Sequence, residues 1–170
     1  MACCAVKHST PCGVAVGSSA LETYKKTFEC DPVSIFGGII GMNFKVDAAT
    51  AEELNKTFLE IVMAPDFDAV ALEILRKKKN LRIIKIKNAV SDKQTWVKID
   101  GGILVQDNDN QFSDKIETVT VFKPSAEQEK ALLFAQRVVK YVKSNAIVVS
   151  NGIQALGIGG GQVNRIWATQ

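Results

Sequence analysis

The stretch Val6–Gly17, VKHSTPCGVAVG, decides the fold that this sequence predicts. It begins at the end of Ala2–Val6, a short apolar run typical of a buried strand, and passes through Lys7 and His8 into a segment marked by a proline and a glycine. Helical and strand patterns then alternate along the chain. A buried strand so early, followed by that alternation, predicts an α/β fold.

Capping residues and apolar periodicity divide the rest of the chain into helices and strands. Helices are expected from the capping boxes Ser19–Glu22 and Thr50–Glu53, from Asp68 to Lys79, and from Ser125. Their expected buried residues are Leu21, Tyr24 and Phe28, then Ala51, Leu54 and Phe58, and finally Ala131, Phe134, Ala135, Val138 and Val142. Strands are expected at Ile35–Met42, Ile61–Met63, Leu81–Ile86, Ala146–Val149 and Ala155–Ile158, with a hairpin over Thr95–Gln106. Because helical crossovers alternate with hairpins, we expect a mixed sheet.

Composition sets limits on the class of protein. The 170 residues are 46% apolar and 23% charged, as in soluble globular domains, and predict one domain over residues 1–170. No apolar stretch approaches the ~18 residues of a membrane span, and the first residues lack a signal-peptide pattern. The net charge of +3 is too small to indicate a nucleic-acid partner.

The cysteine and histidine counts argue against disulfide and zinc chemistry. Cys3, Cys4, Cys12 and Cys30 crowd into the first fifth of the chain, which favours reduced thiols in a cytoplasmic protein. His8 is the single histidine, so a zinc site built from several histidines is excluded. The zinc deaminase signature also fails, because no glutamate stands two residues after His8 and no second cysteine stands three residues after Cys12.

Lys7 and His8 are the most suggestive pair for catalysis. They stand at the end of a predicted strand, where α/β sheets bind ligands, and the imidazole is the one side chain that titrates near neutrality. A neighbouring ammonium group would favour the neutral imidazole, ready to accept a proton. A lone histidine can equally be structural, so the residues by themselves leave both interpretations open.

Three other features allow both a functional and a structural interpretation. Gly157–Gln162 is a glycine-rich turn that could present backbone N–H groups to an anion, although it fails the dinucleotide fingerprint. Asn145 alone is typical of a turn, and Glu60, at the entry of a buried strand, needs either an internal Arg or Lys partner or a ligand donor.

Taken together, these residues resemble the aminoimidazole-carboxamide ribonucleotide (AICAR) transformylase domain of the bifunctional purine-biosynthesis family. The matching stretches are Val6–Gly17, Asp31–Asn43, Val46–Leu54, Phe58–Ile84, Val138–Val149 and Gly157–Ile166. The resemblance implies a three-layer α/β/α fold with a mixed sheet, cytidine-deaminase-like and without zinc. It also implies that the chain corresponds to the first half of that domain, with the second half and the IMP cyclohydrolase domain absent.

The resemblance further implies formyl transfer from 10-formyltetrahydrofolate, the cosubstrate, to the 5-amino group of AICAR. His8 matches the general base, Lys7 a residue that stabilises the developing oxyanion, and Asn145 a residue that orients the formyl group. The matched substrate-binding residues are Glu60 for the carboxamide or amine, Phe36 and Gly37 for the nucleotide and folate pocket, and Arg165 and Ile166 for the folate side. A monovalent cation near residues 139–145 is also suggested.

The family's active site spans a homodimer interface, so the expected partner is a second copy or a chain that supplies the second half, with neither nucleic acid nor a membrane. Two other functions stay open. In the first, the chain is a non-catalytic half-domain or subunit that binds nucleotide or a partner chain but needs the missing half for activity. In the second, it is a regulatory subunit that uses the same pocket without chemistry.

Overall fold

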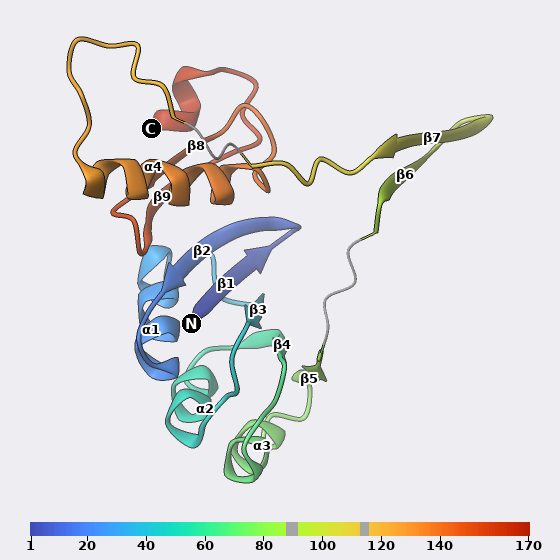
Figure 1. The fold of residues 1–170 in the computed structure, drawn as a ribbon. Helices are drawn as coiled ribbons and strands as arrows, with labels where there is room; N and C mark the ends of the chain where they lie inside the picture. Colours follow the sequence, from blue (N-terminus) through green and yellow to red (C-terminus); the bar gives the residue numbers. More distant parts are fainter. Residues whose placement is uncertain (88–91, 113–115) are drawn as a thin grey trace.

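The computed structural model describes residues 1–87, 92–112 and 116–170 and shows an α/β fold (Figure 1). One five-stranded sheet contains β1 (Ala2–Lys7), β2 (Thr10–Val16), β3 (Gly38–Met42), β4 (Leu59–Ala64) and β5 (Arg82–Lys85). Two hairpins pair β6 (Gln94–Ile99) with β7 (Gly102–Asp107) and β8 (Ile147–Ser150) with β9 (Ala155–Gly159). The helices are α1 (Ala20–Cys30), α2 (Ala48–Asn55), α3 (Ala69–Arg76), α4 (Ala126–Val139) and the short 3₁₀ helix η1 (Ile166–Thr169).

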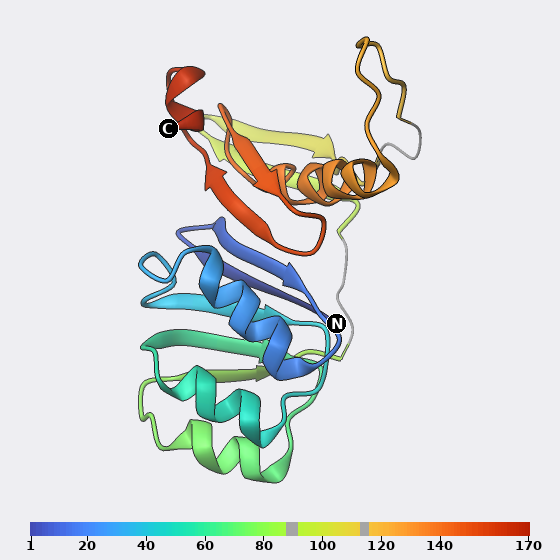
Figure 2. The same ribbon diagram turned by 90° about the vertical axis from the view of Figure 1, so that its left-hand side faces the viewer.

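The sheet is mixed, in the order β2-β1-β3-β4-β5. β1 is antiparallel to both of its neighbours, whereas β3, β4 and β5 are parallel to one another. The β8–β9 hairpin continues the sheet beyond β2, through a bridge between Ala15 and Gln154 and a 2.7 Å hydrogen bond from the Val16 N–H to the Ile153 carbonyl. Figure 2 shows these strands stacked side by side with α1, α2 and α3 across one face.

On the opposite face of β1 and β2, α4, which packs on the β8–β9 hairpin, lies across a cavity. Side chains of Val6, Val14 and Val16 line this cavity together with Phe134 and Val138 of α4. Helices therefore cover both faces of the sheet, and the three-layer, cytidine-deaminase-like α/β class expected from the sequence is confirmed. Within the described residues, no group of three or more His, Cys, Asp or Glu side chains is placed to hold a metal ion. No described helix is long and apolar enough to span a membrane.

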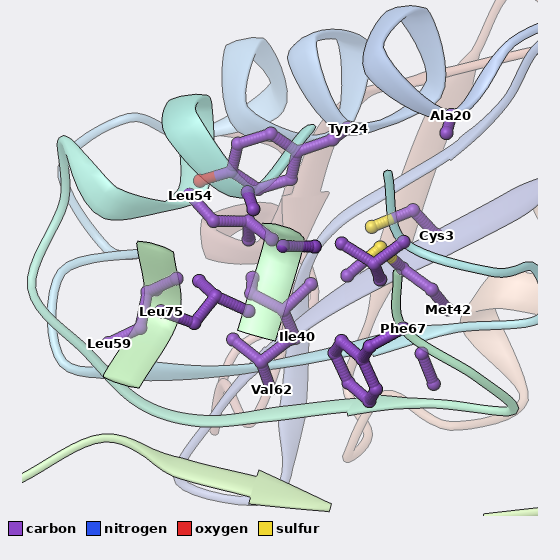
Figure 3. Close-up of a cluster of buried hydrophobic side chains, with 14 of the residues drawn as sticks. Cys3, Ala20, Tyr24, Ile40, Met42, Leu54, Leu59, Val62, Phe67 and Leu75 are labelled. Atoms are coloured by element: carbon purple, nitrogen blue, oxygen red, sulfur yellow. The ribbon is translucent and has the colours of Figure 1, made fainter. Parts of the chain in front are cut away.

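The main core lies between the sheet and α1–α3 (Figure 3). Ile40 and Val62 project from β3 and β4 and are fully buried, as is Leu54 of α2. Alternate residues of β3 are buried, which is the period of a strand with one face toward a core. Burial of each such side chain contributes about 1.5–3 kcal/mol, so this layer holds the helices on the sheet.

α1 packs unusually close to β2 because Gly13 of β2 and Gly17, the residue after this strand, face it. A Cβ atom on Gly13 would lie 2.3 Å from the Thr27 carbonyl oxygen, and one on Gly17 would lie 2.6 Å from the Thr23 hydroxyl. The helix therefore turns Thr23 and Thr27 toward the sheet, both fully buried, in addition to the expected Tyr24. Their hydroxyls donate to the carbonyls four residues earlier, at 2.6 and 2.8 Å, which satisfies them inside the core.

Several expected boundaries were wrong. β2 was not expected, because Pro11 and Gly13 suggested a turn; Pro11 instead lies at the register shift where the β1–β2 ladder is irregular. The second helix begins at Ala48, since Asp47, not Thr50, is its cap and accepts the Thr50 N–H at 2.8 Å. This helix ends at Asn55, so Phe58 lies outside it, and the Phe58 side chain is 41% exposed.

Other boundaries were close to expectation. β3 begins at Gly38 instead of Ile35, and the third helix ends at Arg76 instead of Lys79. Ser125 forms a complete capping box with Gln128, as expected for the longest helix. Among its expected buried residues Val138 and Val142 are buried, but Val142 lies beyond the end of α4. The expected hairpins formed by residues 94–107 and 147–159 are confirmed.

We expect Gly13→Ala to destabilise the fold by about 1–3 kcal/mol, because the new methyl group would collide with helix backbone that cannot rotate away. Urea unfolding monitored by circular dichroism measures the change. Gly157→Ala is the matched control, since a Cβ atom there meets nothing within 4 Å. Equal stability of the two variants would show that the α1–β2 approach is not a packing constraint.

We expect Glu22 to make the fold sensitive to acid. Its carboxylate accepts hydrogen bonds from Lys26 and from the Ser18 hydroxyl and N–H, and these contacts lower its pKa to about 2. Because the folded-state pKa lies below the ordinary value of 4.5, the contribution to stability is complete above pH 4.5 and is lost as pH falls toward 2. Stability of Glu22→Gln, measured by urea unfolding from pH 6 to 2, should therefore fall less steeply than that of the parent chain.

Candidate active site

The topology brings all eight predicted site residues to one end of the sheet. Because β1 is antiparallel to β3, the end of β1 lies beside the beginnings of the parallel strands β3, β4 and β5. β9 is antiparallel to β2, so the last residue of β9 lies at the same end of the sheet as the last residue of β1. The first residue of β8 pairs with the end of β9 and lies there too. This end of the sheet, here called the rim, is its left-hand edge in Figure 2. The residues gathered there are Lys7, His8, Phe36, Gly37, Glu60, Asn145, Arg165 and Ile166.

His8 occupies a strained two-residue turn between β1 and β2. Lys7 pairs with Thr10 across the hairpin, which leaves His8 and Ser9 as its loop, with φ angles of 50° and 64°. Such left-handed conformations are normal for Asn-Gly in this kind of turn and cost other residues about 1–2 kcal/mol each. The imidazole is exposed, and no hydrogen bond to it is found within the described residues. The turn thus holds a free imidazole at a fixed place on the rim.

Lys7 is held against the segment that precedes β3. Its Nζ atom donates a hydrogen bond to the Phe36 carbonyl oxygen. Gly37 has a φ of +68°, and a Cβ atom there would lie 3.0 Å from that Nζ atom. The Gly37 N–H donates to the Phe58 carbonyl at 2.8 Å, which ties the segment to the beginning of β4. Gly37 therefore lets the ammonium group come close to the backbone.

Two aromatic rings form an exposed platform next to Lys7. The rings of Phe36 and Phe58 lie 5.3 Å apart between centroids, and Phe36 is 60% exposed. The sequence pattern had assigned Phe58 to a helix, so its place at the site was missed. An exposed aromatic pair beside a cation can receive the flat face of a ring system.

Glu60 forms an ion pair with Arg82. Its carboxylate lies 2.7 Å from the Arg82 guanidinium, at the beginning of the next strand. The internal cation expected as one alternative is therefore present, although both side chains are about half exposed. A pair so open to water contributes little to stability, which leaves the carboxylate available to a ligand. Arg82 was not among the expected site residues.

Asn145 is bound to the glycine-rich turn. Its side-chain amide and its backbone N–H both donate to the Gln162 carbonyl, at 2.8 and 3.1 Å, and its own carbonyl accepts the Gln162 N–H at 3.3 Å. The amide oxygen of Asn145 is left for other contacts. The Ser144–Asn145 peptide bond is cis. Gln162 is the residue at which the glycine-rich turn departs from the dinucleotide fingerprint.

The glycines of this turn serve packing more than anion binding. A Cβ atom on Gly159 would lie 2.1 Å from the Ala168 carbonyl oxygen, and one on Gly160 would lie 2.2 Å from a Val142 methyl carbon. The Gly161 N–H donates to the Lys143 carbonyl at 2.5 Å. The N–H groups of residues 161 and 162 thus donate to carbonyls within the protein, so these two donors are not available to an anion.

The predicted residues form two clusters, not one. The first contains Lys7, His8, Phe36, Gly37 and Glu60, and the second contains Asn145, Arg165 and Ile166. Arg165 and Ile166 are both exposed at the beginning of η1, three residues beyond Gln162. Within the described residues, no hydrogen bond or ion pair joins the two clusters. A single copy therefore presents two adjacent sets of groups on the same rim.

None of the cysteine thiols has the character of a nucleophile. All four are free, and burial raises the pKa of Cys3 to about 12 and that of Cys4 to about 11. Burial also raises the pKa of Cys12 and of Cys30. The thiolate forms are therefore scarce at neutral pH, and the reactive groups of the rim are the imidazole, the ammonium, the carboxylate and the amide.

Comparison with known proteins assigns the family. The model of the AICARFT/IMPCHase bienzyme family matches residues 1–170. The bifunctional purine biosynthesis protein PurH of Fusobacterium nucleatum is 60% identical over 168 residues, which are 99% of this chain and 33% of that protein. PurH of Clostridium botulinum strain Eklund 17B is 60% identical over 169 residues, and PurH of Clostridium perfringens is 59% identical over 169 residues; each match covers 99% of this chain and 34% of the relative.

The chain spans about a third of the length of the curated relatives it matches. The matched region covers almost the whole chain and therefore includes the segments that form the rim. This chain belongs to the AICARFT/IMPCHase bienzyme family.

Proposed function

We propose that this chain carries part of the active site for formyl transfer from 10-formyltetrahydrofolate to the 5-amino group of AICAR, in purine biosynthesis in the cytoplasm. The observation that carries the proposal is the rim cluster of an exposed imidazole, an adjacent ammonium group and a carboxylate, beside two exposed aromatic rings. Membership of a family whose relatives are named as purine biosynthesis proteins supports it.

The rim groups match what the reaction demands. The 5-amino group is a weak nucleophile, because its lone pair is delocalised toward the carboxamide. His8 accepts a proton from this amine as its nitrogen bonds to the formyl carbon, and Lys7 donates a hydrogen bond to the oxyanion that forms. When the oxyanion collapses, the bond from carbon to N10 of the folate breaks, and that nitrogen takes up a proton. The products are the formylated ribonucleotide and tetrahydrofolate.

The remaining residues bind and orient the two substrates. Glu60 receives the amine or carboxamide of the ribonucleotide, while Phe36 and Gly37 form the wall of the nucleotide and folate pocket. Asn145 orients the formyl group through its amide, and Arg165 and Ile166 contact the folate. A monovalent cation near residues 139–145 supports the segment before Asn145. In this proposal residues 1–170 are the first half of the transformylase domain.

A second copy, or a chain carrying the second half of the domain, completes the site. Within the described residues, no hydrogen bond or ion pair joins the two clusters of one copy. In this proposal the substrates bridge them, either within one chain or between the His8 cluster of one chain and the Asn145 cluster of another. The same separation favours one alternative, in which this chain is a non-catalytic half-domain or subunit that needs its missing half. Binding energy that positions both substrates would then be incomplete.

The direct test is formyl transfer by the purified 170-residue chain, supplied with AICAR and 10-formyltetrahydrofolate and followed by tetrahydrofolate absorbance. Turnover supports the catalytic proposal. A folded chain without turnover, whether or not it binds AICAR, contradicts catalysis by this chain alone and supports the half-domain alternative.

We expect His8→Gly to reduce transfer by about 10²–10⁴-fold, the usual contribution of a general base. The variant should fold at least as stably as the parent, because glycine adopts the φ of 50° without strain. Ser9→Gly is the matched control: it relaxes the same turn and keeps the imidazole, so transfer should persist. Transfer by His8→Gly near the parent rate would contradict the role of His8 as base.

We expect Gly37→Ala to reduce transfer by at least about 10-fold, because the new methyl group would displace the Lys7 ammonium from its contact with Phe36. Initial rates at saturating AICAR measure the change. Gly152→Ala is the control for backbone strain alone, since it has a φ of +92° but makes only ordinary contacts with Ala131. If both variants lost equal activity, the position of Lys7 would not be the cause.

A further inference from the structure

Arg82 lies at the rim but has no part in the proposed function. It begins β5 and pairs with Ile61 of β4, and its Nη1 atom donates to Oε2 of Glu60 at 2.7 Å. Within the described residues, this contact is the one hydrogen bond found for either side chain. The second carboxylate oxygen of Glu60, Oε1, is therefore left as an acceptor at the rim.

The backbone that carries Glu60 is held from two sides. Lys78, two residues after α3, donates from its Nζ atom to the Thr57 carbonyl at 2.6 Å. The Phe58 carbonyl accepts the Gly37 N–H at 2.8 Å. Two carbonyls just before β4 are thus anchored, and the ladders with β3 and β5 hold the residues that follow. On such a fixed backbone the carboxylate moves only through its own rotamers, and a contact at its tip selects among them.

The charge of Glu60 needs compensation if the substrates of the proposed reaction are to bind beside it. The ribonucleotide AICAR carries a phosphate group with about two negative charges at neutral pH, and the folate carries carboxylates. Glu60 is the one acidic residue among the predicted site residues. The Arg82 cation offsets this negative charge and leaves Oε1 able to accept an N–H or O–H group from the substrate.

We propose that Arg82 is a positioning residue for substrate binding: it holds Oε2 of Glu60, so that Oε1 is a fixed acceptor whose charge is already compensated. The inference rests on the proposed function for the contact between Glu60 and AICAR, and it goes further by naming the residue that prepares this contact. A side chain that is held before the ligand arrives loses less conformational freedom on binding. Because Arg82 acts through Glu60, its effect is on the affinity for AICAR and not on the transfer step.

The same two strands carry a second ion pair at the opposite end of the sheet. Lys85, the last residue of β5, lies against Asp66, which follows β4. These two side chains are 50% and 46% exposed, compared with 64% for Arg82 and 45% for Glu60. The two pairs are alike in their strands, charge and exposure, and they differ in whether they stand at the rim. Lys85→Gln is therefore the matched control for Arg82→Gln.

Calorimetric titration of the 170-residue chain with AICAR tests the inference. We expect Arg82→Gln to weaken AICAR binding about 3- to 10-fold, the usual gain from fixing one flexible side chain, and Lys85→Gln to leave it unchanged. Arg82→Lys should bind within about 2-fold of the parent chain, because a single N–H···O contact does not require the planar fork of arginine. Urea unfolding should show similar stability for both glutamine variants, since both ion pairs are open to water.

A double-mutant cycle separates action through the carboxylate from a direct contact with the substrate. In the Glu60→Ala background, Arg82→Gln should cause no further loss of AICAR affinity, because the group that Arg82 positions is gone. An equal loss in both backgrounds would mean that Arg82 binds AICAR by itself, and this result overturns the inference. Unchanged binding by Arg82→Gln, or a parent chain that binds no AICAR, overturns it as well.

The titration does not measure formyl transfer, so this inference and the proposed function can fail separately. A chain that binds AICAR in the expected pattern without turnover contradicts catalysis by this chain alone, yet it supports the positioning role of Arg82. Turnover that Arg82→Gln leaves unchanged in both kcat and the KM for AICAR supports the catalytic proposal and contradicts the positioning role. A KM raised with kcat unchanged is the result expected of a residue that prepares binding.

Discussion

The antiparallel ladder between β1 and β3 is the interaction on which the rest of this structure depends. It places one reversed strand beside three parallel strands, so the end of β1 meets the beginnings of β3, β4 and β5. With β1 parallel to β3, Lys7 and His8 would lie at the opposite end from Phe36, Gly37 and Glu60. Residues separated by more than fifty positions share one rim because of this single strand direction.

The same strand direction determines which charges the rim can use. α2 and α3 follow β3 and β4, so their N-termini lie at the other end of the sheet. The partial positive charge of a helix N-terminus, which often binds anions in α/β proteins, is therefore not available to the rim from these helices. Positive charge there comes from side chains, namely Lys7, Arg82 and Arg165. Lys7 is held by a backbone carbonyl that only a glycine neighbour leaves accessible.

The two faces of the sheet differ in how completely they are packed. Toward α1, Gly13 on β2 and Gly17 directly after it allow contact with the helix so close that a methyl group would not fit. On the opposite face, Gly41 of β3 leaves a hollow. The β6–β7 hairpin, which is not part of this sheet, exposes large apolar side chains. Glycine thus has opposite effects on the two faces: on one it allows close packing of a helix, and on the other it leaves open space. The packed face holds α1 against the sheet, whereas the described residues leave part of the other face uncovered.

Local sequence determined much of this fold and the identity of the candidate groups. The helix caps at Ser19 and Ser125, the buried strand before Lys7 and the β6–β7 hairpin depend on contacts between near neighbours, and the residue pattern was sufficient to predict them. The residues by themselves drew attention to Lys7 and His8, whereas Asn145 became a candidate only through the family resemblance, and the roles of all three stay predictions.

Only the tertiary structure decided which of these groups meet. The pairing of Glu60 with Arg82, the tilted contact of Phe58 with Phe36 and the attachment of Asn145 to Gln162 join residues from different strands and loops. The period of a strand or helix fixes which face a residue takes, but it does not specify the neighbouring strand or its direction. Those are set by burial and by hydrogen bonds over long separations, and for this reason the rim, its two clusters and the β2 strand emerged from the fold and not from the pattern.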